Sequence, residues 1–527
     1  MSDAIQVDLT AQALARDVAH ERTLTAFPIL VGLVLAKILI QFAGIAHYGF
    51  FRDELYYMAC GEHPAWGYVD QPPFIAWVAW FANHVLGNSM IAVRILPVLA
   101  GAAVIFLTGV LAAELGGGKT AQSVGALAML VAPAYLAFDS FFSMNAFEPL
   151  FWLLCAWIAV RIVRGASQKM WLAFGLVAGI GLENKHTMLV FGFALVAGLL
   201  LAGEWRLFRS KWIWVGGAIA FAIFLPNLIW EATHGWPQIE VVRNAQDFKN
   251  VPVGPLEFLL EQILFLHPLS VPLWVGGLAW FFVASEGKRY RFLGWAYVIV
   301  LLIFMVLRGK TYYVLPVYPI LLAAGGVAFE KVVSAGNFSA IVQYAYPVIL
   351  VLAGIVTVPF GVPVLPVNTF LHYAAMLPYD DIHTEKDATV ALPQLYADMT
   401  GWDNMAATVA RVYYSLPESQ RADCAILGGN YGEAGAIDYY GPKLGLPKAI
   451  SGHNAYFYWG PRNYSGVCVI LFGENAERTK RLFGEVREAA RILNPYGMPG
   501  EINLPVYICR KPEAPLATLW PQFKMII

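Results

Sequence analysis

Long apolar segments alternate with short polar loops over the first two thirds of the chain. Each segment is about 20 residues long, which is the length that an α-helix needs to cross the hydrocarbon core of a bilayer. The alternation predicts a mainly α, polytopic helical membrane protein with about 11–13 spans. Eleven of them can be placed, near residues 25–46, 89–114, 121–138, 146–163, 170–184, 187–203, 212–230, 257–283, 292–307, 312–329 and 343–361.

Basic residues gather in alternate loops and predict the orientation of the chain. By the positive-inside rule, loops rich in Lys and Arg face the cytoplasm. The predicted inner segments contain Arg16, Arg22, Arg161, Arg164, Lys169, Arg206, Arg209, Lys211, Lys288, Arg289, Arg291 and Lys331. The predicted outer loops are 47–88, 138–146, 184–187, 231–256 and 308–311, together with everything after about residue 362.

The pattern divides the chain into three parts. Residues 1–24 are polar and mixed in charge, which is not typical of a cleavable signal peptide and predicts a short cytoplasmic arm. Residues 25–365 form the membrane domain. Residues 366–527 contain two strand-like runs, at 424–429 and 467–473, and a helical pattern at 475–493. Strands alternating with amphipathic helices predict a small α/β domain, placed outside the cytoplasm.

Composition narrows the class of protein. The chain of 527 residues is 58% hydrophobic and 13% charged, whereas a soluble domain has about 25% charged residues. The net charge of −1 and the lack of a basic tract give no sign of a nucleic-acid partner. Three cysteines lie in the predicted outer domain, Cys424, Cys468 and Cys509. An oxidising compartment permits one disulfide among them, and three buried free thiols are the alternative.

The first outer loop holds the densest group of polar and aromatic residues. Its acids Asp53, Glu54 and Asp70 fit two interpretations: caps of short helices in a solvated loop, or groups held in a groove at the membrane surface. The second is favoured because the loop is rich in aromatic residues and runs into PPFIAWVAWFANHVLG, a pattern typical of an interfacial helix. A carboxylate held there could act as a general base or bind a divalent metal.

The other outer loops add acids and cations. The second contains Asp139, Asn145 and Glu148, and acids at the mouth of a span usually face a cavity or a partner. Lys185 and His186 form the third, where Lys185 could instead extend to the interface. The fourth contains Glu231, His234 and Trp236. In the fifth, Arg308, Lys310, Tyr312 and Tyr313 could hold a phosphate or anchor a helix end.

Five motifs in order resemble a known family. DELYY with GYVDQPP, a short acidic second loop, NKHT, PNLIWEATHGWP and GKTYYVLPVYP are similar to the bacterial branch of the GT-C glycosyltransferases. This is the group of family 39 and dolichyl-phosphate-mannose-protein mannosyltransferase-like enzymes, which includes the aminoarabinose transferase of lipid A. The resemblance covers about residues 25–330, and loosely GGNYGEAGAIDYYG and NAYFYWG further on.

The resemblance implies roles for individual residues. Asp53 would be the general base and Glu54 its support at the catalytic centre. The donor phosphate would be bound by Lys185, Arg308, Lys310 and Tyr313. Contacts to the substrates, or structural roles beside them, are implied for Tyr57, His63, Tyr68, Asp70, Asp139, Asn145, Glu148 and His234.

The family uses a polyprenyl-phosphate-linked sugar as donor and inverts the anomeric centre in one displacement. The implied protein is an inner-membrane enzyme whose active site faces the periplasm and whose acceptor is an envelope lipid, glycan or protein. Many relatives have Pro-Asp in the second outer loop, where this chain has Met144-Asn145. Glu148 or Asp139 could supply a second acid, or the site works with one.

Two alternatives to this interpretation remain at the level of sequence. Some GT-C enzymes need a divalent cation and others do not, so no metal is assigned. A polytopic transporter or flippase for a lipid-linked or anionic substrate is the competing function. It is less favoured because few charges, chiefly Lys37 and Glu261, lie within predicted spans, and no inverted repeat is evident.

Overall fold

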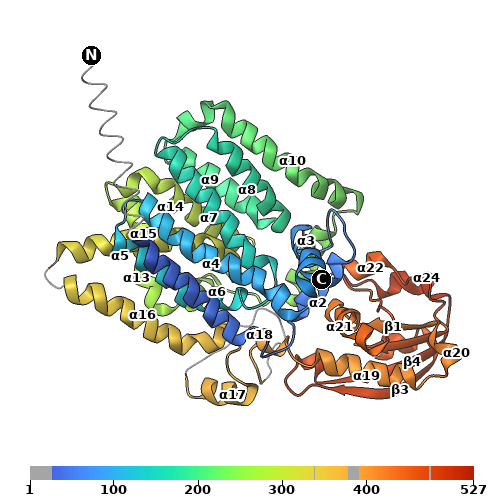
Figure 1. Ribbon diagram of the computed structural model, residues 1–527. Helices are drawn as coiled ribbons and strands as arrows, with labels where there is room; N and C mark the ends of the chain where they lie inside the picture. The colour runs from blue at the N-terminus through green and yellow to red at the C-terminus, as the bar shows by residue number, and fades with distance from the viewer. Residues whose placement is uncertain (1–25, 337–338, 378–390, 474–475) are drawn as a thin grey trace.

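The protein consists of a helical part followed by an α/β part (Figure 1). The computed structural model describes residues 26–336, 339–377, 391–473 and 476–527. The predicted cytoplasmic arm, residues 1–24, lies outside the described residues. The helical part ends with α16 (Ser339–Gly361) and the short helix α17 (Val367–Ala375), and the sheet begins at Cys424.

Seven described helices are long and apolar enough to span a bilayer, and the polytopic helical class is confirmed. A further span is bent by 94° between α12 (Pro255–Leu266) and the helical segment Pro268–Val283, which contains α13 (Val271–Val283). The seven are Ala26–Gly44, Met90–Glu114 (α4), Met144–Val163 (α7), Lys211–Thr233 (α10), Gly287–Val306 (containing α14, Arg291–Val306), Thr311–Ala335 (containing α15, Tyr318–Ala335) and Ala340–Gly361 (in α16).

The number of full-length spans is lower than the eleven placed from the sequence because three segments form shorter helices. The segment 121–138 is divided into α5 (Lys119–Val131) and α6 (Pro133–Phe138). Pro133 has no N–H and disfavours helical backbone in the residue before it, so α5 ends there. The segments 170–184 and 187–203 form α8 (Met170–Asn184) and α9 (Thr187–Leu201), each of 15 residues.

The loops separate into two groups at opposite ends of the helical part. At one end Arg164 pairs with Glu114, Arg289 donates to the Val163 carbonyl at 2.7 Å, and Lys331 pairs with Glu286 at 2.7 Å. Loops predicted to be outside contact one another at the other end. Phe142 N–H donates to Glu54, Asn184 to the Met144 carbonyl, and Asn227 to the Trp66 carbonyl. The division of the loops by charge therefore agrees with their grouping in space.

Short helices cover the end beside the α/β part. The first outer loop contains α2 (Arg52–Gly61) and α3 (Phe74–Phe81), which continues as a π-helical turn over Ala82–Gly87. Trp77, Trp80 and Phe81 of α3 are exposed, as an interfacial helix requires. The other short elements of the helical part, at either end, are Trp205–Arg209, α11 (Pro237–Asn244), Ala245–Lys249, Pro268–Ser270, Gly287–Tyr290 and Thr311–Val317.

The α/β part is built on a four-stranded mixed sheet of order β1-β2-β4-β3. The strands are β1 (Cys424–Gly428), β2 (Cys468–Phe472), β3 (Phe483–Leu493) and β4 (Asn503–Pro512). β1 and β2 are parallel, and β4 is antiparallel to both β2 and β3. Around the sheet lie α18 (Gln394–Ala397), α19 (Trp402–Tyr414), α20 (Glu418–Arg421), α21 (Tyr431–Tyr440), Gly441–Leu444, α22 (Ala455–Trp459), α23 (Ala476–Lys480), Pro499–Glu501, α24 (Leu516–Leu519) and Trp520–Phe523.

The prediction of a helix over 475–493 was wrong for most of its length. Only Ala476–Lys480 is helical, and Phe483–Leu493 is β3. The residues of this segment favour helices, but β3 pairs with β4 along its whole length, with a register shift between Glu488 and Ala490. Pairing with a neighbouring strand outweighs intrinsic propensity. The charged residues that suggested a helix protect β3, which is an edge strand.

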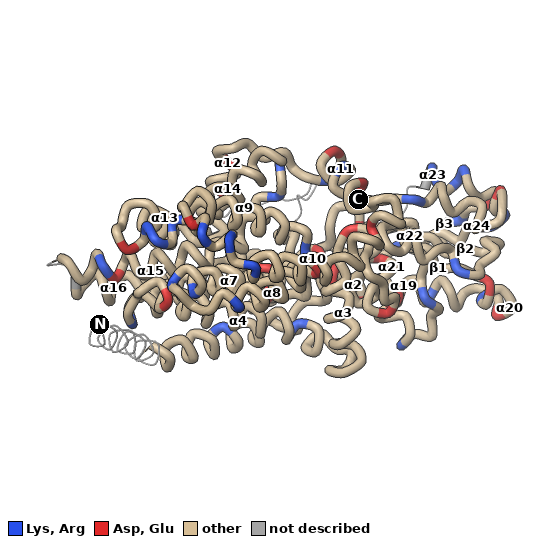
Figure 2. Tube along the Cα trace, turned by 90° about the horizontal axis from the view of Figure 1, so that it is seen from above, with Lys and Arg blue, Asp and Glu red and all other residues tan. Residues whose placement is uncertain are grey.

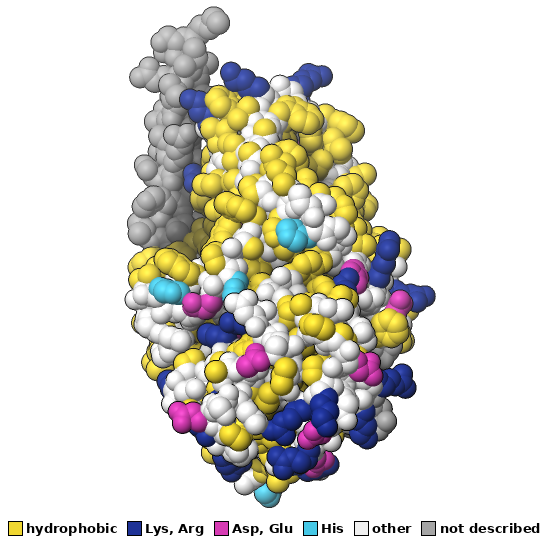
Figure 3. All heavy atoms as spheres, turned by 90° about the vertical axis from the view of Figure 1, so that its right-hand side faces the viewer, with side chains coloured by type: hydrophobic (Ala, Val, Ile, Leu, Met, Phe, Trp, Pro, Cys, Tyr) yellow, Lys and Arg dark blue, Asp and Glu magenta, His cyan; other side chains and the backbone are white. Residues whose placement is uncertain are grey.

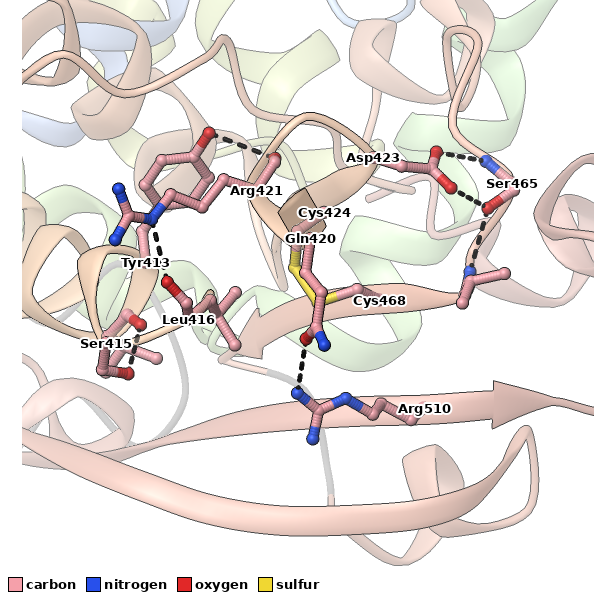
Figure 4. The surroundings of a disulfide bond; sticks show 12 residues. Tyr413, Ser415, Leu416, Gln420, Arg421, Asp423, Cys424, Ser465, Cys468 and Arg510 are labelled. Atoms are coloured by element: carbon pink, nitrogen blue, oxygen red, sulfur yellow. Dashed lines mark hydrogen bonds between the residues drawn. A yellow bond between two sulfur atoms is a disulfide. The ribbon is translucent and has the colours of Figure 1, made fainter. Parts of the chain in front are cut away.

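A disulfide joins Cys424 to Cys468 (Figure 4). The two cysteines are directly opposite each other in the parallel pair of β1 and β2. Cys509 is a free, buried thiol in β4. The structure therefore selects one pair among the three cysteines of this part.

The surface differs between the two parts of the molecule. In Figure 3 apolar side chains cover the upper region, and Lys, Arg, Asp and Glu gather lower, on the α/β part. Figure 2 shows several acidic residues on and beside α2, α10 and α21, towards the α/β part. An apolar surface over the helices and a charged α/β part are typical of a membrane protein with a domain in water.

Candidate active site

Glu54 and Arg94 form a fully buried ion pair that fixes the start of α2. Arg94 donates to both carboxylate oxygens of Glu54, at 2.9 and 2.6 Å. The backbone N–H groups of Phe51 and Phe142 donate to the same carboxylate, each at 2.7 Å. Arg94 also donates to the carbonyls of Ile45 and Gly49. Glu54 thus ties α2 to α4 and to the second outer loop, and its geometry is that of a positioning residue.

Asp53 is beside Glu54 in sequence but faces a different environment. Its side chain is 28% exposed, and its carboxylate accepts a hydrogen bond from the Tyr431 hydroxyl at 2.8 Å. The guanidinium of Arg52 is 3.8 Å away. Asp53 is therefore held in place while part of its carboxylate remains open to a ligand.

Asp70 is the second carboxylate of this region. One of its oxygens accepts from the Tyr56 hydroxyl at 2.7 Å and the other from the Asn454 amide at 3.2 Å. Burial raises the pKa of Asp70 to about 6; the nearby charge of Asp53 adds to this rise, and the hydrogen bond from Tyr56 opposes it. A carboxylate with a raised pKa thus lies near a second carboxylate, an arrangement suited to acid–base chemistry.

Lys185 is the centre of a cationic group on the other side of the site. Its ammonium donates to the side-chain amide oxygen of Asn145 at 2.8 Å and to Glu148 at 3.0 Å, and lies 4.4 Å from the centre of the Tyr313 ring. Burial lowers the pKa of Lys185, Glu148 opposes this, and the nearby Lys310 adds to it. The two hydrogen bonds use two of the three N–H groups of the ammonium, which leaves one for an anionic ligand.

Lys310 and Arg308 extend this group towards a small cavity. Lys310 lies 5.8 Å from the centre of the Tyr312 ring, and Lys185 lies 5.6 Å from the same ring. A cavity of about 160 Å³ is lined by Arg308 and Lys310 together with Asp247, Glu261 and Thr311. Tyr312 thus joins Lys185 to Lys310, while Arg308 is more exposed at the edge of the cavity.

Tyr57 is near the acids and near Tyr312, whose ring lies beside the cations. Its pKa is raised well above the usual value by burial, and then by the nearby groups Asp53, Asp70, Tyr431 and Tyr312. Tyr57 is therefore close to both carboxylates and to Tyr312, which is the neighbour of Lys185 and Lys310. Tyr57 and Tyr312 thus link the two groups, and no hydrogen bond or ion pair joins Asp53 or Asp70 directly to Lys185 or Lys310 among the described residues.

Other predicted substrate contacts lie in the supporting structure. Asp139 is buried and pairs with Lys37 of the first span at 2.7 Å; a Cβ on Gly101 would lie 2.0 Å from its carboxylate, so only glycine permits this approach. Tyr68 is buried and bonds to the backbone of Cys60, His63 and Ala65. Glu148 forms an ion pair with Lys185 and accepts a hydrogen bond from the Thr187 hydroxyl.

The two predicted histidines lie at the edge of the contact with the α/β part. His63 stacks on Trp459 with the ring centres 4.1 Å apart, and burial together with nearby Arg462 and Lys448 lowers its pKa. His234 is exposed and stacks on Trp230, also at 4.1 Å. No contact joins either histidine to the carboxylates among the described residues.

Sequence reasoning did not single out Arg94, Tyr431 or Asn454. Arg94 lies within a predicted span, where a charged residue signals a buried partner or a site, and that signal could have found it. Tyr431 and Asn454 occur in GGNYGEAG and NAYFYWG, the two motifs of the α/β part that carried the loose resemblance. Their contact with the first outer loop has no local signature. In the part of the chain that the structure describes, no three His, Cys, Asp or Glu side chains form a group that could hold a metal ion.

A family model and solved structures show which known proteins this chain is similar to. Residues 70–230 match the family model of dolichyl-phosphate-mannose-protein mannosyltransferase. A comparison with curated proteins found no match. The fold is similar to ArnT from Cupriavidus metallidurans bound to undecaprenyl phosphate, with 14% identity and a TM-score of 0.62 over 91% of this chain and 97% of that one. The apo state of ArnT gives 14% identity and 0.61, over 92% and 98%.

A more distant similarity is to the oligosaccharyltransferase of Archaeoglobus fulgidus tethered with an acceptor peptide, with 11% identity and a TM-score of 0.50 over 80% of this chain and 64% of that one. These findings confirm the resemblance drawn from the five motifs. The match to the mannosyltransferase family covers residues 70–230, and the fold is similar to that of ArnT over most of the chain.

Proposed function

We propose that the protein transfers a sugar from a polyprenyl-phosphate donor to an envelope lipid, glycan or protein at the extracytoplasmic face. The observation that carries this proposal is that Tyr57 is near Asp53 and Asp70 and also near Tyr312, whose ring lies beside Lys185 and Lys310. Sugar transfer from a phosphate needs a base for the acceptor and cations for the leaving group. The positive-inside rule supports the placement of this site outside the cytoplasm.

In the proposed reaction Asp53 takes the proton of an acceptor hydroxyl or amine. The acceptor atom forms a bond to the anomeric carbon as the bond from that carbon to the phosphate oxygen breaks, which inverts the centre. The electron pair leaves on the polyprenyl phosphate, whose charge Lys185 and Lys310 stabilise, and Arg308 attracts the anion from the cavity edge. Glu54 holds α2 in position throughout.

An apolar groove gives the donor's lipid tail a place beside the site. It has a volume of about 490 Å³ and runs between α3, α4 and α7, where Phe74, Phe81, Leu99 and Phe147 line it. Phe74 follows Asp70 by four residues, and Phe147 is next to Glu148. A tail in this groove would stay in the bilayer while its phosphate reached Lys185.

The test separates chemistry from donor binding. Asp53→Asn should reduce turnover by at least about 100-fold, since it removes a general base, and should leave binding of undecaprenyl phosphate within about 3-fold of the wild type. Lys185→Met should weaken that binding by at least about 10-fold, because it removes a charge-assisted hydrogen bond. Binding is measured with labelled undecaprenyl phosphate and purified protein in detergent.

Turnover is measured as release of polyprenyl phosphate from the lipid-linked sugars that accumulate in a deletion strain. Mass spectrometry of envelope glycolipids, glycans and proteins from the same strain identifies the sugar and its acceptor by the lost mass. Lys169→Met, on the opposite side of the helical part, is the matched lysine control and should change neither quantity. Wild-type turnover by Asp53→Asn would contradict the proposal.

A further inference from the structure

The α/β part reaches into the catalytic site through the loop after β1. Tyr431 is the first residue of α21, and its hydroxyl donates to the carboxylate of Asp53 at 2.8 Å. Its ring stacks on Tyr56 of α2 with the centres 4.6 Å apart. In parallel sheets, the loops at the carboxyl ends of the strands are the usual place for functional residues. Here that edge is directed at the acids of the first outer loop.

A second loop of the α/β part reaches Asp70. Asn454 donates to Asp70 at 3.2 Å, and the N–H of Ala455 donates to the Tyr56 hydroxyl, which in turn donates to Asp70. The amide oxygen of Asn454 accepts from the N–H of Ile527 at 3.0 Å. This contact fixes the orientation of the amide, so its NH₂ group must point towards Asp70.

The backbone of Asn454 is strained. Its φ is +46°, a conformation that residues other than glycine seldom adopt, and its side chain is 1% exposed. Such strain persists only where the surrounding structure enforces it, and it is concentrated at functional sites. The strained backbone therefore supports a functional role for the Asn454 side chain, which contacts Asp70.

Close packing between α2 and α21 fixes the position of Tyr431 relative to Asp53. A Cβ on Gly435 would lie 3.0 Å from the backbone of Leu55, and one on Gly432 would lie 2.4 Å from the side chain of Arg52. The two helices therefore approach more closely than larger side chains would allow. Tyr431 is held at a fixed distance from Asp53, which is two residues before Leu55.

We propose that Tyr431 and Asn454 are positioning residues for the transfer reaction, through which the α/β part sets the orientation of Asp53 and Asp70. The inference rests on the proposed function, in which Asp53 takes the acceptor proton. The Tyr431 hydroxyl holds one carboxylate oxygen of Asp53 and turns the other towards the acceptor. Asn454 holds Asp70 apart from Asp53, so that Asp70 does not compete for the same hydrogen-bond donor.

The experiment compares Tyr431→Phe with Tyr439→Phe. Both tyrosines belong to α21 and contact the helical part, but the Tyr439 hydroxyl donates to the carbonyl of Asn88 and not to a carboxylate. We expect Tyr431→Phe to lower kcat by at least about 10-fold with KM for the lipid-linked donor changed by less than about 3-fold. Tyr439→Phe should leave both parameters near the wild type. Asn454→Ala should lower kcat like Tyr431→Phe, with Asn404→Ala, an exposed amide in α19, as its control.

A double-mutant cycle tests whether Tyr431 acts through Asp53. In an Asp53→Asn background, Tyr431→Phe should cause no further loss of the residual rate, because residues that act as one unit are not additive. Equal kcat for Tyr431→Phe and Tyr439→Phe, or full additivity with Asp53→Asn, would overturn the inference while wild-type transfer still supported the proposed function. Absence of any transfer by the wild type would instead overturn the proposed function.

Discussion

Asp70 has a hydrogen-bond donor on each carboxylate oxygen and is partly buried. Burial is the largest of the effects that raise its pKa to about 6, and the charge of Asp53 acts in the same direction. A carboxylate of ordinary pKa would be ionised at all pH values above about 5. Asp70 therefore changes its charge in a range that membrane enzymes of the envelope meet, beside the residue proposed as the base.

The raised pKa of Asp70 predicts how stability depends on pH. An unfolded Asp has a pKa of about 3.9, so between about pH 4 and 6 the folded protein binds the proton more tightly, and stability falls as the pH rises through this window. Above pH 6 the ionised carboxylate costs up to about 3 kcal/mol. Asp70→Asn should therefore raise Tm at pH 7.5 and leave it unchanged at pH 4. Scanning fluorimetry in detergent measures this, and an equal Tm at both pH values would contradict it.

At the scale of elements, buried ion pairs hold the helices around the site. Glu54 and Arg94 join α2 to α4, and Lys37 and Asp139 join the first span to the loop after α6. Side chains of both pairs are at most 4% exposed. Taking one charge of such a pair away leaves the other without its counter-charge in a poorly solvated place, which costs far more than losing a surface pair.

The Lys37–Asp139 pair gives a prediction for stability. Asp139→Asn should lower the free energy of unfolding by about 3–5 kcal/mol, because it leaves Lys37 charged and unpaired. The double variant Lys37→Met/Asp139→Asn should recover most of this loss. Thermal unfolding in detergent is the measurement, with Glu286→Gln of an exposed pair as a control that should change it little. If the single and double variants unfolded alike, the pair would not hold the first span.

At the scale of the whole molecule, the site lies where the helical part meets the α/β part. Hydrogen bonds from Tyr431 to Asp53 and from Asn454 to Asp70 connect residues that are 378 and 384 positions apart in the sequence. The sheet that supports these two residues has its strands β1 and β2 joined by the disulfide (Figure 4). Loss of order in β1 would therefore disturb the hydrogen bonds to Asp53 and Asp70.

The disulfide should stabilise the α/β part. It closes a loop with a sequence separation of 44 residues, and removing a bridge of this size costs roughly 2–4 kcal/mol. Cys424→Ser/Cys468→Ser should increase hydrogen exchange of the β1 and β2 amides in the full chain and lower transfer activity. Reducing agent should have the same effect on the wild type and none on the double variant. Exchange that is unchanged in β1 would contradict this role.

Much of the fold followed from the sequence because a bilayer restricts what a chain can do. Apolar segments of sufficient length must be helical, and the spacing of basic loops separated the connections into two groups that the structure also separates. The same reasoning failed for Phe483–Leu493, which has the composition of a helix but pairs with β4 in water. Helices shorter than a span were also not distinguished from spans, since packing by neighbours shields their ends.

Part of the candidate site could likewise be predicted from the sequence, and part required the tertiary structure. The motifs of the outer loops by themselves placed Asp53, Lys185, Lys310 and Tyr313 on one side of the membrane, because the side of each loop follows from counting spans. Only the tertiary structure decided that Asp70 is near Asp53. It also decided that Glu54 pairs with Arg94 and Asp139 with Lys37. The hydrogen bonds from Tyr431 to Asp53 and from Asn454 to Asp70 likewise appear only in the folded chain. Local sequence determines which segments enter the bilayer, whereas the partner of a buried polar group depends on which distant segments pack against it.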